Sequence, residues 1–258
     1  MRASKIGLLL LILGFGGVVE TAWFVENRLD VGPSGCRTLG VNFGPSFSFE
    51  EQQRFPVAAG TAVQVRNSFG RVQVQKGEPG QVQVLLRKVV FRRTEEEARA
   101  FAQNIKLSGA GEGKTLRLST NRDELEQGRE RNRVGFETHL EITVPPDTAV
   151  DVENEHGEVD VSDAARVDVK SSFESVRVER AAGPVQIEAR HGDVEVAEVG
   201  GELTVSNRHG RVGVRTVKGT VRVDSEHGDV SVSDVGAAVI GAAHGEVDAQ
   251  NVHGKLEV

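Results

Sequence analysis

The dipeptide His-Gly occurs six times in the C-terminal part of this chain, and each copy is followed by alternating small apolar residues. Typical copies read HGEVDV, HGDVEV and HGDVSV. An internal repeat restricts the fold strongly, because each copy must bury its apolar face against neighbouring copies. The copies begin at His156, His191, His209, His227, His244 and His253.

Between and including these copies, a pair of apolar residues at alternate positions recurs every eight or nine residues, and the first residues of the pairs run from Val159 to Leu256. Nine residues hold one short strand and one tight turn, and apolar residues at every second position mark one buried strand face. The residue two positions earlier is mostly glycine, which suits a corner with positive φ or close backbone approach. The predicted corner glycines are Gly70, Gly157, Gly192, Gly210, Gly228, Gly245 and Gly254.

The residue before the corner differs in type between successive nine-residue units, so the full repeat contains two units and is about 18 residues long. One half of each period carries a ring there, and the other half mostly carries a small residue. Two strands per period predict a β-solenoid in which each coil adds ~4.8 Å along the axis. Regular glycines and period-two valines exclude helical coils. The predicted fold is therefore all-β, a single-chain β-solenoid with one helical insertion and an N-terminal transmembrane or signal helix.

Composition agrees with a thin core of stacked valines. The 258 residues include 30 glycines, one tryptophan and no tyrosine. A net charge of −7 with interspersed signs gives no basic footprint for nucleic acid. Cys36 is the only cysteine, so no intrachain disulfide or cysteine metal cluster can form. Phosphate-loop, G-x-S-x-G and H-E-x-x-H motifs do not occur, so we expect no cofactor and no enzymatic activity.

The N-terminus predicts that most of the chain lies outside the cytoplasm. Arg2 and Lys5 precede an uncharged apolar run over 6–19, which has signal-peptide length. The longer window 6–25 is long enough to span a bilayer. Residues 1–25 are expected to be an uncleaved signal anchor, which gives a single-pass membrane protein. The alternatives are a cleaved signal peptide, which gives a secreted or periplasmic protein, and a buried core helix.

The remaining chain divides into two parts. Residues 26–56, rich in Gly, Ser and Pro, predict a spacer, and residues 57–258 predict the solenoid domain. Val82, Val84 and Leu86 extend the alternating pattern of the domain at its beginning.

A helical insertion is predicted over about 94–106. Thr94 and Glu97 form a capping box, and apolar residues follow at helical spacing, so the helix is expected to cover one end or face of the solenoid. The polar stretch 121–132 is interpreted as a solvated loop.

Two segments and the later G-x-V-x-V copies carry a family resemblance. The segments are VRNSFGRVQVQ at 65–75 and LEITVPPDTAVDVENEHGEVDV at 140–161. They resemble the bacterial putative-adhesin family, a β-strand-repeat domain of unknown function grouped with toast-rack β-solenoids, over roughly residues 57–258. The resemblance implies an extracytoplasmic or membrane-attached solenoid, sometimes linked to envelope stress, and supplies no catalytic motif. Histidine at the corner departs from the usual glycine or asparagine.

The recurring rings are the first candidate site. Spaced 17 or 18 residues apart, they should stack as one column. Neutral imidazoles bind zinc, copper or nickel, and charged imidazoles would repel one another, so a metal-binding or pH-sensing column is one hypothesis. Phenylalanine stands in the same position at Phe69 and Phe173 and cannot bind metal, which favours a packing ladder. The candidate metal ligands are His156, His191, His209, His227 and His244.

The outward acids are the second candidate site, because polysaccharide-cleaving β-helices carry catalytic carboxylates on an outer face. They are Asp160, Asp193, Glu195, Asp229, Glu246 and Asp248. Arg177 is expected between Asp160 and Glu195, and Arg211 between Asp193 and Asp229. This pattern is typical of a surface ladder of opposite charges rather than a catalytic pair.

The sequence therefore predicts a non-enzymatic, extracytoplasmic and membrane-attached scaffold or adhesin-like interaction domain of the bacterial cell envelope. A polysaccharide-binding or polysaccharide-cleaving β-helix protein is the main alternative. The expected partners are the membrane, through the N-terminal helix, and an envelope protein or glycan, but not nucleic acid. Because the last strand ends at Val258 without a polar cap, end-to-end self-association is a further expectation.

Overall fold

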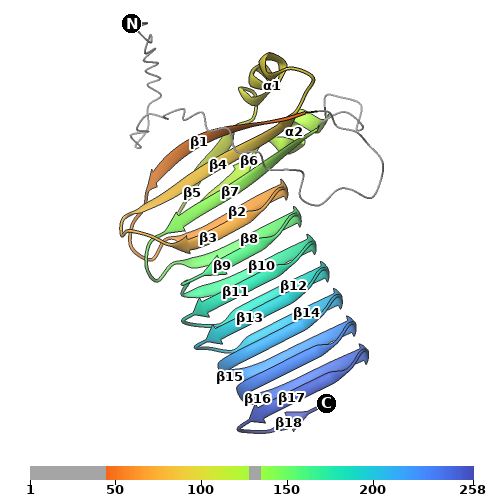
Figure 1. The fold of residues 1–258 in the computed structure, drawn as a ribbon. Helices are drawn as coiled ribbons and strands as arrows, with labels where there is room; N and C mark the ends of the chain where they lie inside the picture. The colour runs from red at the N-terminus through yellow and green to blue at the C-terminus, as the bar shows by residue number, and fades with distance from the viewer. Residues whose placement is uncertain (1–44, 128–134) are drawn as a thin grey trace, which may run out of the picture.

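The structure, a computed structural model, describes residues 45–127 and 135–258. In these ranges the chain is an all-β solenoid whose strands stack along one axis, with two short helices at the end opposite the C-terminus (Figure 1). Neither of these helices has the length and apolar character needed to cross a membrane. The signal anchor or signal peptide predicted over 1–25 lies outside the described residues.

The coils consist of parallel strands that alternate between two stacks. Stack A contains β2 (Ala62–Phe69), β8 (Ala149–His156), β10 (Arg166–Phe173), β12 (Val185–His191), β14 (Leu203–His209), the later parts of β15 (Val212–His227) and β16 (Val230–His244), and β18 (Leu256–Glu257). Stack B contains β3 (Val72–Lys76), β9 (Val159–Ser162), β11 (Val176–Ala181), β13 (Val194–Val199), the first parts of β15 and β16, and β17 (Val247–Val252).

Each strand pairs in parallel with the equivalent strand one coil away, so equivalent residues lie directly over one another. In stack A, Val167 pairs with Val185, and Val185 pairs with Leu203. The inward residues of both stacks form one continuous apolar core, and Val169 and Ile187 are fully buried in it. This confirms the two-strand coil, because a regular sequence period stacks identical side chains in register.

The N-terminal end of the solenoid is closed by strands that mostly run antiparallel. Stack B continues from β3 through β7 (Phe136–Val144) and β4 (Gln81–Phe91) to β1 (Ser46–Pro56). Stack A continues from β2 through β6 (Thr115–Thr120) to β5 (Leu107–Glu112). The segment between β3 and β8 therefore leaves the solenoid, builds this end and returns, and β8 then pairs directly with β2.

Helix α1 (Glu95–Ala102) packs on β1 and β4 at this end. Its buried residues join Phe49, Val90 and Phe136 in a second apolar cluster. Lys88, which is 3% exposed, fastens the C-terminal end of the helix. Its Nζ donates to the carbonyl of Ile105 at 2.7 Å and to Glu51 Oε2 at 2.6 Å, so the buried ammonium group is paired.

The structure differs from the sequence predictions in this region. The spacer predicted over 26–56 is wrong for Ser46–Pro56, which forms strand β1. Val82, Val84 and Leu86 lie in β4, which pairs antiparallel with β7 and is not a solenoid coil. The same alternation of apolar residues serves both arrangements, because a half-buried strand has a period of two whatever its direction.

Helix α1 begins where the capping box predicts, since Thr94 Oγ1 accepts a hydrogen bond from the Glu97 backbone N–H. It ends at Ala102 rather than near 106. The loop predicted over 121–132 is wrong at its start, because α2 (Arg122–Gln127) forms there. Arg122 is buried, which a solvated loop would not require.

Candidate functional site

Seven rings form a column along one corner of the solenoid, here called the ring column. It consists of Phe69, His156, Phe173, His191, His209, His227 and His244. Ring centroids are 4.5 to 5.1 Å apart from His156 onwards, with interplanar angles of 4° to 13°. The rings stack because parallel pairing places His191 against His209 and His209 against His227. They remain accessible at their edges, and Phe173 is 43% exposed.

Six of the seven corners beside the ring column carry glycine, and the corner after Phe173 carries Glu174 at a φ of 75°. Gly70, Gly157, Gly192, Gly210, Gly228 and Gly245 have φ between 120° and 149°. A Cβ atom on Gly210 would lie 2.2 Å from the carbonyl oxygen of Gly192, one coil away. Both the backbone conformation and the close approach of successive corners therefore exclude a side chain at these positions.

Gly254 also lies at a corner, but at the one opposite the ring column. A Cβ atom there would meet the carbonyl oxygen of Gly236, and its φ lies outside the left-handed region. At the same corner, the backbone N–H of His253 donates to the carbonyl oxygen of Val235. The last His-Gly dipeptide follows the previous one by half a coil, so His253 does not extend the ring column.

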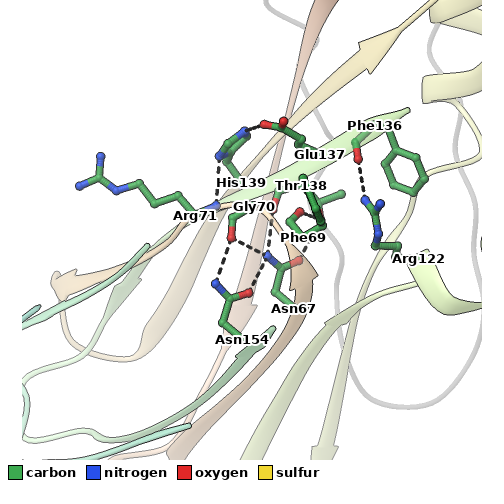
Figure 2. Close-up of polar contacts among 10 residues, drawn as sticks. All are labelled: Asn67, Phe69, Gly70, Arg71, Arg122, Phe136, Glu137, Thr138, His139 and Asn154. Carbon is green, nitrogen blue, oxygen red and sulfur yellow. Dashed lines mark hydrogen bonds and ion pairs between the residues drawn. The ribbon is translucent and has the colours of Figure 1, made fainter. Parts of the chain in front are cut away.

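A row of buried polar side chains lies two positions before the rings. It comprises Asn67, Asn154, Ser171, Asn207 and Ser225. Asn154 Nδ2 donates to the carbonyl oxygen of Gly70 at 3.1 Å (Figure 2) and to that of Gly157 at 2.8 Å, which fastens two successive corners. Sequence reasoning missed this row. The sequence pattern that could have revealed this row is an asparagine or serine at an inward strand position, where an apolar residue is expected.

Arg122 closes the N-terminal end of the ring column. Its guanidinium carbon lies 4.9 Å from the Phe69 ring centroid and 4.2 Å from that of Phe136. Arg122 Nη1 also donates to the Phe136 carbonyl oxygen at 2.6 Å, as Figure 2 shows. The cation covers the faces of two aromatic rings, an arrangement that stabilises both.

His139 lies outside the ring column, at the edge of the same end of the solenoid (Figure 2). Its Nδ1 accepts a hydrogen bond from the backbone N–H of Arg71 at 3.1 Å. The proton of the neutral ring therefore belongs on Nε2, which lies 3.0 Å from Glu137 Oε2 and donates to it. This histidine joins β3 to β7.

The geometry of the ring column does not suit a metal bound between neighbouring rings. Two nitrogens bound to one zinc ion lie at most about 4.2 Å apart, since each Zn–N bond is about 2.1 Å. Neighbouring histidine centroids are 4.8 to 4.9 Å apart, and the nearly parallel rings point equivalent nitrogens in the same direction. Among the described residues, no group of three His, Cys, Asp or Glu side chains is arranged to hold a metal ion.

The outer face of stack B carries the predicted ladder of opposite charges. Arg177 Nη2 lies 2.8 Å from Glu195 and its Nε lies 3.9 Å from Asp160, so Arg177 stands between two carboxylates. Arg211 Nη2 pairs with Asp193 at 3.1 Å. The other expected partner, Asp229, instead accepts a hydrogen bond from the backbone N–H of Glu246.

Two further acids on the outer surface have shifted pKa values. Hydrogen bonds from the Arg180 guanidinium hold the pKa of Asp163 below its usual range. Burial, and then the charge of Asp151 in the adjacent coil, raise the pKa of Asp168. The Oδ1 atom of Asp168 is buried without a hydrogen-bond partner. Sequence reasoning did not single out either residue, because both shifts depend on neighbours in another coil.

The outer face of stack A contains a trough of about 690 Å³ that runs along the solenoid axis. Its floor is the backbone beneath the buried polar row, and its walls are two rows of outward side chains. The first row is Glu153, Lys170, Glu188, Ser206 and Asp224, and the second is Glu155, Ser172, Arg190, Arg208 and Glu226. A smaller hollow of about 230 Å³ lies on stack B around Gly213.

The coils, corners and ring column define a β-solenoid repeat protein. More particularly, the chain belongs to the Toastrack DUF4097 family, whose sequence profile matches residues 72–258. The match begins in β3 and includes every coil after it, which confirms the family resemblance seen in the sequence.

Two solved structures similar to this chain are described as adhesion proteins. A putative cell adhesion protein from Clostridium sporogenes is 8% identical, with 81% of this chain and 100% of that chain covered and a TM-score of 0.37. A putative adhesin from Bacteroides fragilis is 12% identical, with 81% and 96% covered and a TM-score of 0.36. No curated protein matches the chain.

Proposed function

We propose that this protein is a non-enzymatic scaffold of the bacterial cell envelope, attached to the membrane and displaying its solenoid outside the cytoplasm as an adhesin-like interaction domain. The in-register stacking of both strand stacks is the observation that carries the proposal. It fixes rows of outward side chains at the ~4.8 Å spacing of the coils, which produces a long and rigid binding surface. A role in envelope stress agrees with the family resemblance.

The arrangement of charges supports an interaction role over catalysis. Glycoside hydrolysis needs two carboxylates on either side of a cleft, one of them a proton donor. On stack B the acid at Glu195 is paired with Arg177, and that at Asp193 with Arg211. These pairs leave neither Glu195 nor Asp193 as a free carboxylate for a substrate.

The cellular address is proposed from Arg2, Lys5 and the apolar run that follows them. Fusion of alkaline phosphatase to the C-terminus tests it, since this enzyme is active only outside the cytoplasm. We expect an active phosphatase fusion and an inactive β-galactosidase fusion. Retention in the membrane after alkaline carbonate extraction indicates an uncleaved anchor, and release indicates a cleaved signal. An active β-galactosidase fusion contradicts the proposed address.

A polysaccharide-binding or polysaccharide-cleaving protein is the second candidate, and the trough on stack A favours it. Incubation of the full chain with envelope polysaccharides, followed by a reducing-sugar assay, separates polysaccharide cleavage from a non-enzymatic scaffold. We expect no release of reducing ends. Turnover of any polysaccharide would overturn the scaffold proposal.

A pH-sensing ring column is the remaining candidate. His191, His209 and His227 are stacked in succession, and like charges at this separation repel. Circular dichroism melts at neutral and mildly acidic pH test it. A melting temperature that is the same at both pH values removes this candidate.

A further inference from the structure

The trough on stack A extends across strands of six successive coils, from β8 to β16. It lies between the two rows of outward side chains defined above, which follow the solenoid axis rather than the strands. A ligand in it would therefore cross the strands at right angles. This direction suits a long polymer, because every coil repeats the same two wall positions.

Five polar side chains in the two walls have no hydrogen-bond or ion-pair partner among the described residues. They are Glu155, Ser172, Arg190, Ser206 and Asp224. Each comes from a different coil, and together they span ~19 Å at the strand spacing of ~4.8 Å. The other wall residues are already paired, such as Lys170 with Glu188 at 3.8 Å and Arg208 with Glu226 at 3.3 Å. The trough thus offers one unused polar group per coil.

We propose that this trough binds a linear, uncharged polysaccharide that lies parallel to the solenoid axis. The inference rests on the proposed function and names the partner of that scaffold. Sugar hydroxyls both donate and accept hydrogen bonds, so they pair equally with the carboxylate of Glu155, the hydroxyl of Ser172 and the guanidinium of Arg190. The coil repeat is also close to the length of one sugar unit in an extended chain.

The charges of the walls disfavour the other polymer classes. A polyanion would meet Glu155, Glu188 and Asp224, and a polycation would meet Lys170 and Arg190. A peptide strand cannot add to this surface through its backbone, because the floor amides and carbonyls already pair between coils. An uncharged, hydroxyl-rich chain is repelled neither by the wall acids nor by the wall bases, and it does not need free backbone groups in the floor.

The floor of the trough is held rigid before any ligand arrives. Asn207 Nδ2 donates to the carbonyl oxygen of Gly210 at 3.0 Å, and Asn154 fastens two corners in the same way. The ring column follows immediately after the second wall row in sequence. A preorganised surface loses little entropy on binding, which favours weak but regular contacts along a polymer.

The test is a binding titration of the full chain against neutral, acidic and basic polysaccharides, represented by glucan and mannan, alginate, and chitosan. We expect saturable binding to a neutral polymer that exceeds binding to either charged class. Ser206→Trp fills the trough and should weaken this binding at least tenfold. Thr204→Trp is the matched control, since Thr204 is an exposed residue on the outer face of the same strand but does not line the trough.

Circular dichroism melts of both variants show whether the solenoid remains folded. The proposal is overturned if only charged polymers bind, if no polymer of the panel binds, or if both tryptophan variants bind as well as the parent chain. An active phosphatase fusion together with any of these results would leave the scaffold proposal standing and remove only the glycan. A cytoplasmic address would instead remove the scaffold proposal.

Discussion

Arg122 lies with its guanidinium carbon 4.9 Å from the centroid of the Phe69 ring, so the ring column ends at a cation and not at solvent. The same side chain donates to the Phe136 carbonyl oxygen, which joins α2 to β7. One residue of an apparently solvated stretch thus covers Phe69, the first ring of the ring column, and ties it to β7.

Replacing Arg122 with methionine should destabilise this end of the solenoid. Arg122→Met keeps an apolar stem of similar length but loses the bond to Phe136 and the cation over two rings, a loss of about 2 kcal/mol. Chemical denaturation measures the change. Arg215→Met is the control, because Arg215 is exposed and has no ion-pair partner in the described chain. Equal effects of the two variants would contradict the covering role of Arg122.

The ring column should tolerate another ring but not the loss of one. His209→Phe is expected to change the free energy of unfolding by less than about 0.5 kcal/mol, since Phe173 already occupies an equivalent position. His209→Ala should cost about 1–3 kcal/mol, because it leaves a gap between His191 and His227. Thermal melts of both variants provide the comparison. If phenylalanine is as harmful as alanine, the ring nitrogens matter and the packing interpretation is wrong.

Transition metals should leave the stability of the protein unchanged. The parallel rings do not bring neighbouring nitrogens together, so Zn²⁺, Cu²⁺ or Ni²⁺ has no preformed site between them. Melting temperatures with and without each ion, and after treatment with a chelator, measure the effect. A rise in melting temperature that His209→Phe abolishes would instead support the metal-binding alternative.

Replacement by alanine should destabilise the protein at Gly210 but not at Gly213, three positions later. Gly210→Ala places a methyl group 2.2 Å from the Gly192 carbonyl oxygen at a φ of 122°, so a loss of about 3 kcal/mol or more is expected. A methyl group on Gly213 meets no atom within 4 Å, so Gly213→Ala should be neutral or stabilise by up to about 1 kcal/mol. Similar losses for both would show that the corner is not specially constrained.

Asp168→Asn should stabilise the protein at neutral pH. The raised pKa of Asp168 means that the folded state binds its proton more tightly than the unfolded state does. Its charge therefore costs stability at neutral pH, and this cost disappears as pH falls below the unfolded value of about 3.9.

Denaturant titrations at pH 7 and below pH 4 measure this difference. Asp168→Asn should be more stable than the parent at pH 7, and this difference should shrink toward zero as the pH falls through and below the unfolded pKa of about 3.9. Asp224→Asn serves as the control, because Asp224 lies exposed on the same face without a partner in the described chain. If Asp168→Asn is less stable than the parent at pH 7, the charge of Asp168 stabilises the fold and the prediction is wrong.

The regular coils were predictable because their information is local and repeated. Val167, Val185 and Leu203 occupy equivalent repeat positions, and the structure pairs them directly. The pairing of Arg177 with Asp160 and Glu195 follows from the same register. Each of these contacts is decided by the period alone, since parallel in-register stacking places equivalent residues together.

Other parts could not be read from the pattern. Strand β1 has no repeat signature, and its pairing with β4 depends on contacts far apart in sequence. The trough depends on two rows of side chains whose spacing is fixed only when six coils are stacked.

By itself, the sequence determined the repeating unit: glycine at one corner, valine in the core and a ring in the column. These choices recur in nearly every coil, with Glu174 in place of one corner glycine, so neighbouring copies reinforce the same answer. Only the tertiary structure decided how the N-terminal end is closed, with Arg122 over Phe69 and Lys88 beneath α1. Such closures are made once, by residues that no period aligns, and only long-range packing brings them together.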